Sequence, residues 1–141
     1  MKRRCFLPAL ACLAALLAGC ESTSDRKLLE TEKGQVELRQ MQSRAYETAD
    51  REKTLRTIMA TFQDLGFVLD KADATLGTVT ATKLDQYCLR MTVTVRPKGQ
   101  TQVLVRANAQ YNDRAVVEPS PYQQFFNALS KAMFLEAQQV E

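Results

Sequence analysis

Cysteine is the residue type with the most distinctive chemistry in this chain, because the sequence holds four cysteines and no histidine. Without histidine, the chain lacks the usual general base and the commonest metal ligand, and a zinc site of Cys and His cannot be assembled. A thiol can still act as a nucleophile. Of Cys5, Cys12, Cys20 and Cys88, we single out Cys20 because of the residues that precede it.

The first nineteen residues have the pattern of a secretory signal. A positive cluster, Lys2 to Arg4, is followed by an apolar run from Cys5 to Gly19 that only Pro8 interrupts. A basic start and a short apolar stretch are typical of a cleaved signal. The run is too short to span a bilayer comfortably, since that takes roughly 20 apolar residues. We therefore predict a signal peptide over residues 1–19.

The signal ends in Leu17-Ala18-Gly19-Cys20, which resembles the bacterial lipobox. The resemblance implies that Leu17, Ala18 and Gly19 are recognised by the signal peptidase and that the chain is cut before Cys20. It also implies a diacylglycerol on the Cys20 thiol and an N-acyl lipid on the new amino group. No other cofactor and no metal is expected. The alternatives are an ordinary cleaved signal or a single-span anchor, with Cys20 incidental.

Removal of the signal changes the charge and the cysteine count. The whole chain is +3, but the mature chain from Cys20 keeps 16 basic and 16 acidic residues. This balance gives no support for nucleic-acid binding, which needs a basic patch. Cys88 then becomes the lone free thiol. An intrachain disulfide is therefore excluded, even though the compartment should be oxidising. We consider two roles for it: an intermolecular disulfide or redox thiol, and a small half-buried residue.

The mature chain divides into a lipidated cysteine with a polar tether, residues 20–35, and a single domain, residues 36–141. We expect a strand over 36–46, followed by a helix capped by Thr48 or Asp50 and ended by Gly66. One apolar stripe marks that helix: Leu55, Ile58, Met59, Phe62 and Leu65. Short strands are expected at 67–69 and 77–84, with a turn at 71–76 between them.

The clearest strand pattern covers residues 87–96 and 102–111, where apolar and polar residues alternate. We predict a hairpin with Val95 opposite Val103 and an odd-length loop that includes Gly99, since a shift by one residue would set apolar against polar positions. A last helix is expected with Ser120 as its cap, Pro121 at its first helical position and Gln123 at its third.

These elements predict an α+β fold, in which a curved antiparallel sheet of four to five strands carries two helices on one face, in the order β-α-β-β-β-β-α. The order across residues 36–138 resembles helix-grip and TATA-binding-protein-like architectures. Such domains occur in envelope lipoproteins, including a lipoprotein subunit of the outer-membrane β-barrel assembly machinery and uncharacterised families. The resemblance transfers no functional residues.

The sheet face away from the helices is the candidate partner surface. Its central residues are Arg90, Thr92, Thr94, Arg96, Arg106 and Asn108. By alternation the face also includes Cys88, Gln102 and Gln110, and Thr78, Thr80 and Thr82 could join it. Arginine and threonine on a strand can bind peptide, glycan or another protein, although an antiparallel sheet commonly leaves one face simply solvated.

Aromatic side chains offer a second candidate site, a pocket for an acyl chain. The residues that could line it are Tyr46, Tyr87, Tyr111, Tyr122, Phe125, Phe126 and Phe134. Aromatic residues at helical spacing are more often core. Phe134 and Leu135 lie off the main stripe of the last helix, where a dimer or partner contact is an alternative role.

We therefore expect a non-enzymatic, membrane-anchored envelope lipoprotein that serves as an accessory or scaffold subunit of a larger complex. The alternative is a periplasmic carrier or sensor of a small apolar ligand. An enzyme ranks third, because the sequence has no nucleophile-elbow, P-loop or dinucleotide motif. In the sorting rule of enteric bacteria, Glu21 rather than Asp after the lipid cysteine favours the inner leaflet of the outer membrane, facing the periplasm.

Overall fold

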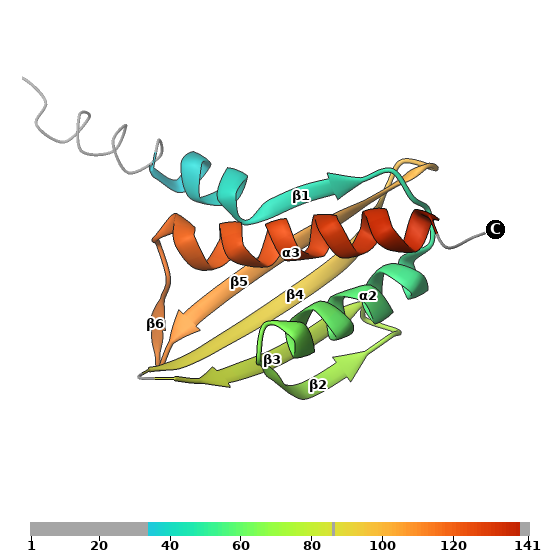
Figure 1. Ribbon diagram of the computed structural model, residues 1–141. Helices are drawn as coiled ribbons and strands as arrows, with labels where there is room; N and C mark the ends of the chain where they lie inside the picture. The colour runs from blue at the N-terminus through green and yellow to red at the C-terminus, as the bar shows by residue number, and fades with distance from the viewer. Residues whose placement is uncertain (1–33, 86, 139–141) are drawn as a thin grey trace, which may run out of the picture. The chain divides into compact units, whose positions relative to one another are not determined.

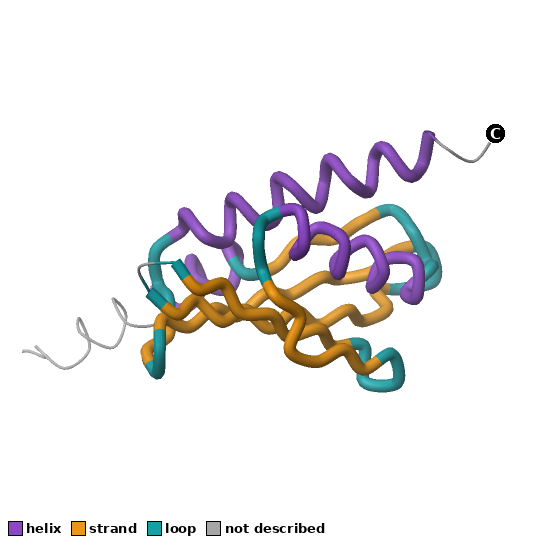
Figure 2. Tube along the Cα trace, turned by 60° about the horizontal axis from the view of Figure 1, so that its bottom comes forward, coloured by secondary structure: helices purple, strands orange, loops and turns teal. Residues whose placement is uncertain are grey.

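An antiparallel sheet is the central element of the fold, and helices α2 and α3 cover one of its faces (Figures 1 and 2). The computed structural model describes residues 34–85 and 87–138. The predicted signal peptide, the lipobox-like residues and most of the predicted tether lie outside these residues. The elements are β1 (Ser43–Tyr46), α2 (Arg51–Asp64), β2 (Val68–Asp73), β3 (Thr78–Leu84), β4 (Cys88–Lys98), β5 (Gln102–Tyr111), β6 (Arg114–Ala115) and α3 (Pro119–Gln138).

The strand order is β1-β5-β4-β3-β2, and β6 also pairs with β5. β1 and β6 share one edge of β5, where β1 pairs with residues 103–106 and β6 with residues 110–111. The predicted α+β class and antiparallel sheet are confirmed. The expected numbers, four to five strands and two helices, were too low. The described residues contain six strands, and a helical segment at 34–41 in addition to α2 and α3.

The β4–β5 hairpin has the predicted faces but a different register. Val95 pairs with Val105, and Lys98 pairs with Gln102, so that a three-residue loop remains. The odd loop length is confirmed, and Gly99 in this loop has a φ of +66°. The predicted pairing of Val95 with Val103 is wrong by two residues, because the strands continue through Pro97 to the loop. A shift of two keeps every side chain on its predicted face.

The predicted strand over residues 36–46 is wrong in its first half. Residues 34–41 are helical, and only Ser43–Tyr46 forms a strand. The segment is rich in good helix formers, namely Glu, Leu, Arg, Gln and Met. Leu38 packs against the core from this helical segment. A longer β1 would also compete with β6 for the same edge of β5.

Helix α2 begins and ends as its sequence predicts. The Asp50 side chain accepts a hydrogen bond from the Lys53 amide at 2.8 Å and so caps the helix. Gly66, with a φ of +80°, follows the helix and takes a conformation that other residues rarely adopt. The buried face includes Ile58 and Phe62 from the predicted stripe.

Three threonines that the apolar stripe did not predict are also buried in α2: Thr54, Thr57 and Thr61. Their hydroxyls donate hydrogen bonds to the carbonyl four residues earlier, at 2.8 to 3.0 Å. A buried hydroxyl costs little free energy when it is bonded in this way.

Two further element boundaries differ from expectation. The predicted turn at 71–76 is shorter, because β2 runs to Asp73 with a bulge between Leu69 and Lys71. Helix α3 begins at Pro119, so that Ser120 and Pro121 lie inside the helix rather than at its cap and first position. A proline suits the first helical position, because its missing N–H would have no partner within the helix.

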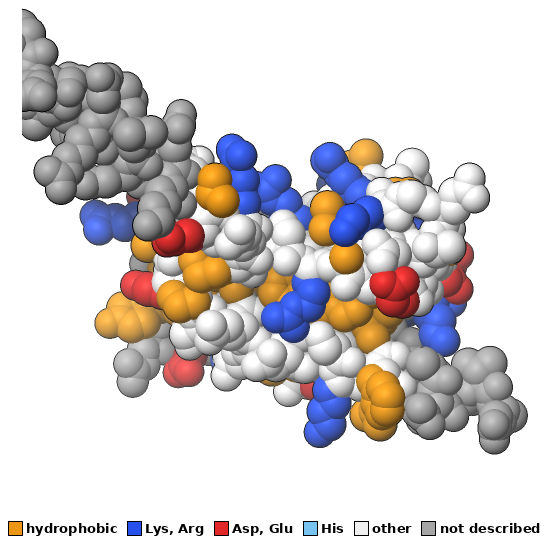
Figure 3. Space-filling model, turned by 90° about the horizontal axis from the view of Figure 1, so that it is seen from above, with side chains coloured by type: hydrophobic (Ala, Val, Ile, Leu, Met, Phe, Trp, Pro, Cys, Tyr) orange, Lys and Arg blue, Asp and Glu red, His pale blue; other side chains and the backbone are white. Residues whose placement is uncertain are grey.

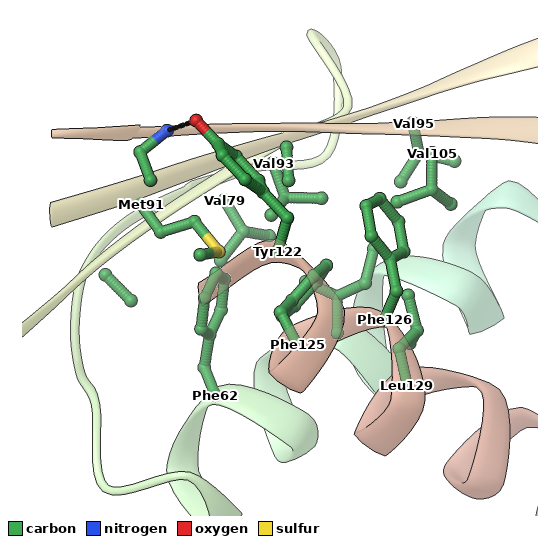
Figure 4. Packing of buried hydrophobic residues seen from close by; sticks show 14 of the residues in the cluster. Phe62, Val79, Met91, Val93, Val95, Val105, Tyr122, Phe125, Phe126 and Leu129 are labelled. Atoms are coloured by element: carbon green, nitrogen blue, oxygen red, sulfur yellow. Dashed lines mark hydrogen bonds between the residues drawn. The ribbon is translucent and has the colours of Figure 1, made fainter. Parts of the chain in front are cut away.

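The core lies between the helices and the sheet, and it is filled by large side chains (Figure 4). Phe62 stacks on Phe125 with ring centroids 5.1 Å apart, and Phe125 meets Phe126 edge to face at 5.2 Å.

The Tyr122 hydroxyl donates to the Val116 carbonyl at 2.8 Å and accepts from the Ala109 amide at 3.2 Å (Figure 4). It also accepts from the Gln42 amide group at 3.2 Å. Tyr122 thus joins α3 to β5 and to the segments beside β1 and β6.

No helix in the described parts of the chain is both long and apolar enough to cross a membrane.

Candidate partner-binding face of the sheet

Alternation along β4 and β5 separates a buried face from an open one. Met91, Val93 and Val95 point to the helices and are at most 1 % exposed, whereas their neighbours point away. All six predicted partner-surface residues lie on the face opposite the helices: Arg90, Thr92, Thr94, Arg96, Arg106 and Asn108. We name this surface, together with its flanking polar residues on β2 and β3, the open face.

Strand register fixes the arrangement of these side chains. Arg106 lies opposite Thr94, and Asn108 lies opposite Thr92, so that four of the six form two adjacent rows across β4 and β5. Arg96 extends the same surface beside Leu104. These side chains border a shallow hollow of about 200 Å³, lined by Thr94, Arg96, Leu104, Arg106 and Asn108. Arg90 lies outside it, farther along β4.

The open face has an excess of positive charge. By register it carries five cations, namely Lys71, Arg90, Arg96, Lys98 and Arg106. Its carboxylates are Asp73, opposite Thr78, and Asp70, which accepts a hydrogen bond from the Thr82 hydroxyl. A third carboxylate, Glu47, borders the face and accepts a hydrogen bond from the Gln102 side chain. Arg90, Arg96 and Arg106 are exposed and form no ion pair within the described ranges. This face is therefore locally basic.

A different distribution is seen from above, on the side of β1 and the helical segment 34–41 (Figure 3). Basic, acidic and apolar side chains are interspersed there. The excess of cations on the open face is therefore not seen on this side of the molecule.

Unpaired guanidinium groups can bind carboxylates or phosphates through two parallel hydrogen bonds. The threonines add neutral donors and acceptors, although Thr80 and Thr92 already hydrogen-bond to each other at 3.1 Å. This combination suits recognition of an anionic surface.

Cys88 lies at the start of β4, on the open face and two residues from Arg90. It is half-buried and unbridged. Its backbone carbonyl accepts a hydrogen bond from the Asn112 amide at 2.9 Å, and it pairs with the exposed Leu84 across the sheet.

The predicted aromatic pocket does not form as one site. Tyr122, Phe125 and Phe126 are fully buried in the core, whereas Tyr87 and Phe134 are 65 % and 64 % exposed. Tyr87 stacks edgewise on Tyr111 with ring centroids 6.1 Å apart. The aromatic side chains are therefore divided between the core and the surface and do not line one pocket.

Tyr46 and Phe134 do border a common hollow of about 300 Å³, which opens between the β1–α2 connection and the end of α3. The Tyr46 hydroxyl lies 3.1 Å from the Ser130 hydroxyl. Burial raises the pKa of the Tyr46 phenol, while its bond to Ser130 and the nearby Arg44 charge act in the opposite direction.

Two arginine contacts were not apparent from the sequence. Arg44 lies over the Phe126 ring at 5.0 Å and donates to the Ser130 hydroxyl at 3.2 Å, which fastens β1 to α3. Arg51 donates to the Thr75 carbonyl at 2.8 Å, from the first turn of α2 to the β2–β3 turn. Both join residues far apart in the chain, and no local pattern predicts such pairs.

The structure thus places the six candidate residues on one exposed basic surface and distributes the candidate aromatic residues between core and periphery. In comparisons with known proteins, no protein-family model matches the chain, and no curated protein matches it.

Proposed function

We propose that this chain is a lipid-anchored protein of the bacterial envelope, with a domain that binds an acidic partner through the open face. Residues 1–19 act as a signal peptide, and Cys20 carries the lipid. The observation behind the partner role is the set of unpaired arginines on one face of a sheet whose other face is packed with helices.

The anchor and the face act together in this proposal. Several acyl chains on one residue give stable anchoring, whereas one alone is marginal. Confinement to a membrane raises the effective concentration of the domain for its neighbours, so that a modest contact area suffices. The domain then serves as an accessory or scaffold subunit without catalytic activity, with the inner leaflet of the outer membrane as the proposed location.

The packed core does not favour the alternative of a carrier for an apolar ligand. Such a protein needs a ligand-sized cavity, commonly between helices and sheet. Here that space holds side chains at most 1 % exposed, including Ile58, Phe62 and Leu129.

The anchor is tested by substituting Cys20. We expect Cys20→Ala to lose incorporation of labelled palmitate and to leave the membrane fraction. A substituted chain that keeps the label and stays with the membranes would overturn the anchor.

The partner surface is tested by charge reversal and crosslinking in intact cells. A photoreactive amino acid at Thr94 should crosslink to a neighbour, and the double substitution Arg90→Glu with Arg106→Glu should abolish that adduct. Arg39→Glu with Lys131→Glu is the matched control, because both residues are exposed, lie in helical segments and change the net charge equally. An adduct that survives in the sheet variant, or vanishes equally in the control, would refute a role for this face.

A further inference from the structure

Five of the eight large apolar side chains that are exposed in the described residues lie at one end of the domain, whereas Leu76, Phe134 and Leu135 lie elsewhere. This end, which we name the tether end, comprises the β3–β4 turn, β6, the start of α3 and the start of the described chain (Figure 1). Hydrogen bonds connect its parts, since the Asn112 amide donates to the Cys88 carbonyl and the Val116 amide donates to the Ala109 carbonyl.

Both corners of the tether end carry such side chains. At the corner of the β3–β4 turn, Leu84 is 81 % exposed and Tyr87 is 65 % exposed, and Val68 lies on the adjoining strand opposite Thr82. At the other corner, Val36 and Val117 are both more than half exposed. We name these five residues the apolar rim.

The chain leading to Cys20 starts from this same end. Gly34 opens the described domain there, and it lies fourteen positions after Cys20 in the sequence. Such a segment reaches about 50 Å at full stretch, and a flexible one has an average span near 20 Å. The eleven-residue strand β4 alone is about 36 Å long. An anchored chain therefore brings the tether end to the membrane far more readily than the opposite end.

The charges at this end are mixed. Lys83, Arg90 and Arg114 lie among Asp85, Asp113 and Glu118. The contact is therefore apolar rather than electrostatic, and tyrosine suits it because an amphipathic ring favours the membrane–water interface. We propose that the apolar rim inserts into the interface of the bilayer that holds the Cys20 lipid. This contact orients the open face at a steep angle to the membrane, where a neighbouring protein can reach it.

The proposal rests on the proposed lipid anchor, and the two are tested separately. The chain has no tryptophan, so a single introduced tryptophan reports only its own position. The lipidated protein, with the lipid on Cys20 verified by mass spectrometry, is reconstituted in phosphatidylcholine vesicles with or without phosphatidylglycerol. Brominated lipid then quenches a tryptophan that enters the interface.

Three variants distinguish the orientations: Tyr87→Trp at the rim, Leu76→Trp in the β2–β3 turn at the opposite end, and Asn108→Trp on the open face. We expect a blue-shifted and strongly quenched emission for Tyr87→Trp alone, in both vesicle types and at high salt. Adding Leu84→Asp to that variant should abolish the quenching.

Quenching of Asn108→Trp, especially only with phosphatidylglycerol, would show that the open face lies on the membrane and would overturn the proposal. Equal or absent quenching at all three positions would also overturn it while leaving the anchor intact. Absence of lipid on Cys20 would remove the anchor and this inference together.

Discussion

Among the glycines of the domain, Gly77 is the one at which an added methyl group should lower the free energy of unfolding most. The residue has a φ of +70°, and its backbone is held on both sides: its amide donates to the Asp73 carbonyl and its carbonyl accepts from the Val95 amide, both at 2.8 Å. A Cβ atom here would lie 2.6 Å from the Arg51 Nε and 2.7 Å from the Val95 carbonyl oxygen. Side-chain carbons do not approach other heavy atoms so closely.

The magnitude for Gly77→Ala follows from two contributions. A left-handed conformation costs an L-residue roughly 1–2 kcal/mol. Displacement of Arg51 breaks its hydrogen bond to the Thr75 carbonyl, and a bond from a charged donor is worth about 1.5–3 kcal/mol. We expect a loss of about 3–5 kcal/mol in the free energy of unfolding, a large share of the 5–15 kcal/mol typical of a domain.

Gly99→Ala is the matched control, because Gly99 has a similar φ of +66° but no atom within 4 Å of the place that an added methyl group would occupy. It should lose only about 1–2 kcal/mol. Urea unfolding followed by circular dichroism measures both, with an unchanged denaturant slope showing that the folded and unfolded states are comparable. Equal losses in the two variants would refute the steric argument. Gly77→Ala should also cost less in an Arg51→Ala background, since neighbouring residues couple.

Three further predictions concern individual hydroxyl and carboxylate groups. Tyr122→Phe should lower the free energy of unfolding by about 1–3 kcal/mol, because it leaves buried partners of the hydroxyl unpaired, and urea unfolding measures this loss. Asp50→Ala removes the cap on the Lys53 amide and should cost about 1 kcal/mol by the same method, whereas Asp50→Asn should cost much less. The Tyr46 pKa is raised in the folded state, so the unfolded state loses its proton first. Stability should therefore fall as the pH rises above about 10, and Tyr46→Phe should flatten that fall in thermal unfolding.

Side-chain periodicity accounts for what was predictable. The alternation from Leu89 to Val95 decides which side chains meet the helices, so the open face followed from the sequence. The stripe of α2 likewise identified Ile58 and Phe62 as core. Periodicity cannot distinguish registers that differ by two residues, because both bury the same side chains. The sequence therefore predicted which side chains of the hairpin are buried, but not which of two registers two residues apart the strands adopt.

Other features depend on tertiary context. Residues 34–41 contain both a weak alternation and good helix formers, and competition for the edge of β5 decides between them. The contact of Arg51 with the turn at Gly77 joins elements whose proximity exists only in the folded chain. The excess of positive charge on the open face could be predicted only with knowledge of the register of β2, which places Lys71 opposite Thr80.

The bulge in β2 between Leu69 and Lys71 has a consequence for self-association. β2 is an outer strand, and a long flat outer strand exposes backbone groups that can recruit a strand from another copy. The bulge and the charges of Asp70 and Lys71 interrupt such a template. The other margin of the sheet ends in β1, four residues long, and β6, two residues long. With both margins unsuited to strand addition, the described domain offers side chains rather than main-chain groups for contacts with other chains, including other copies of itself.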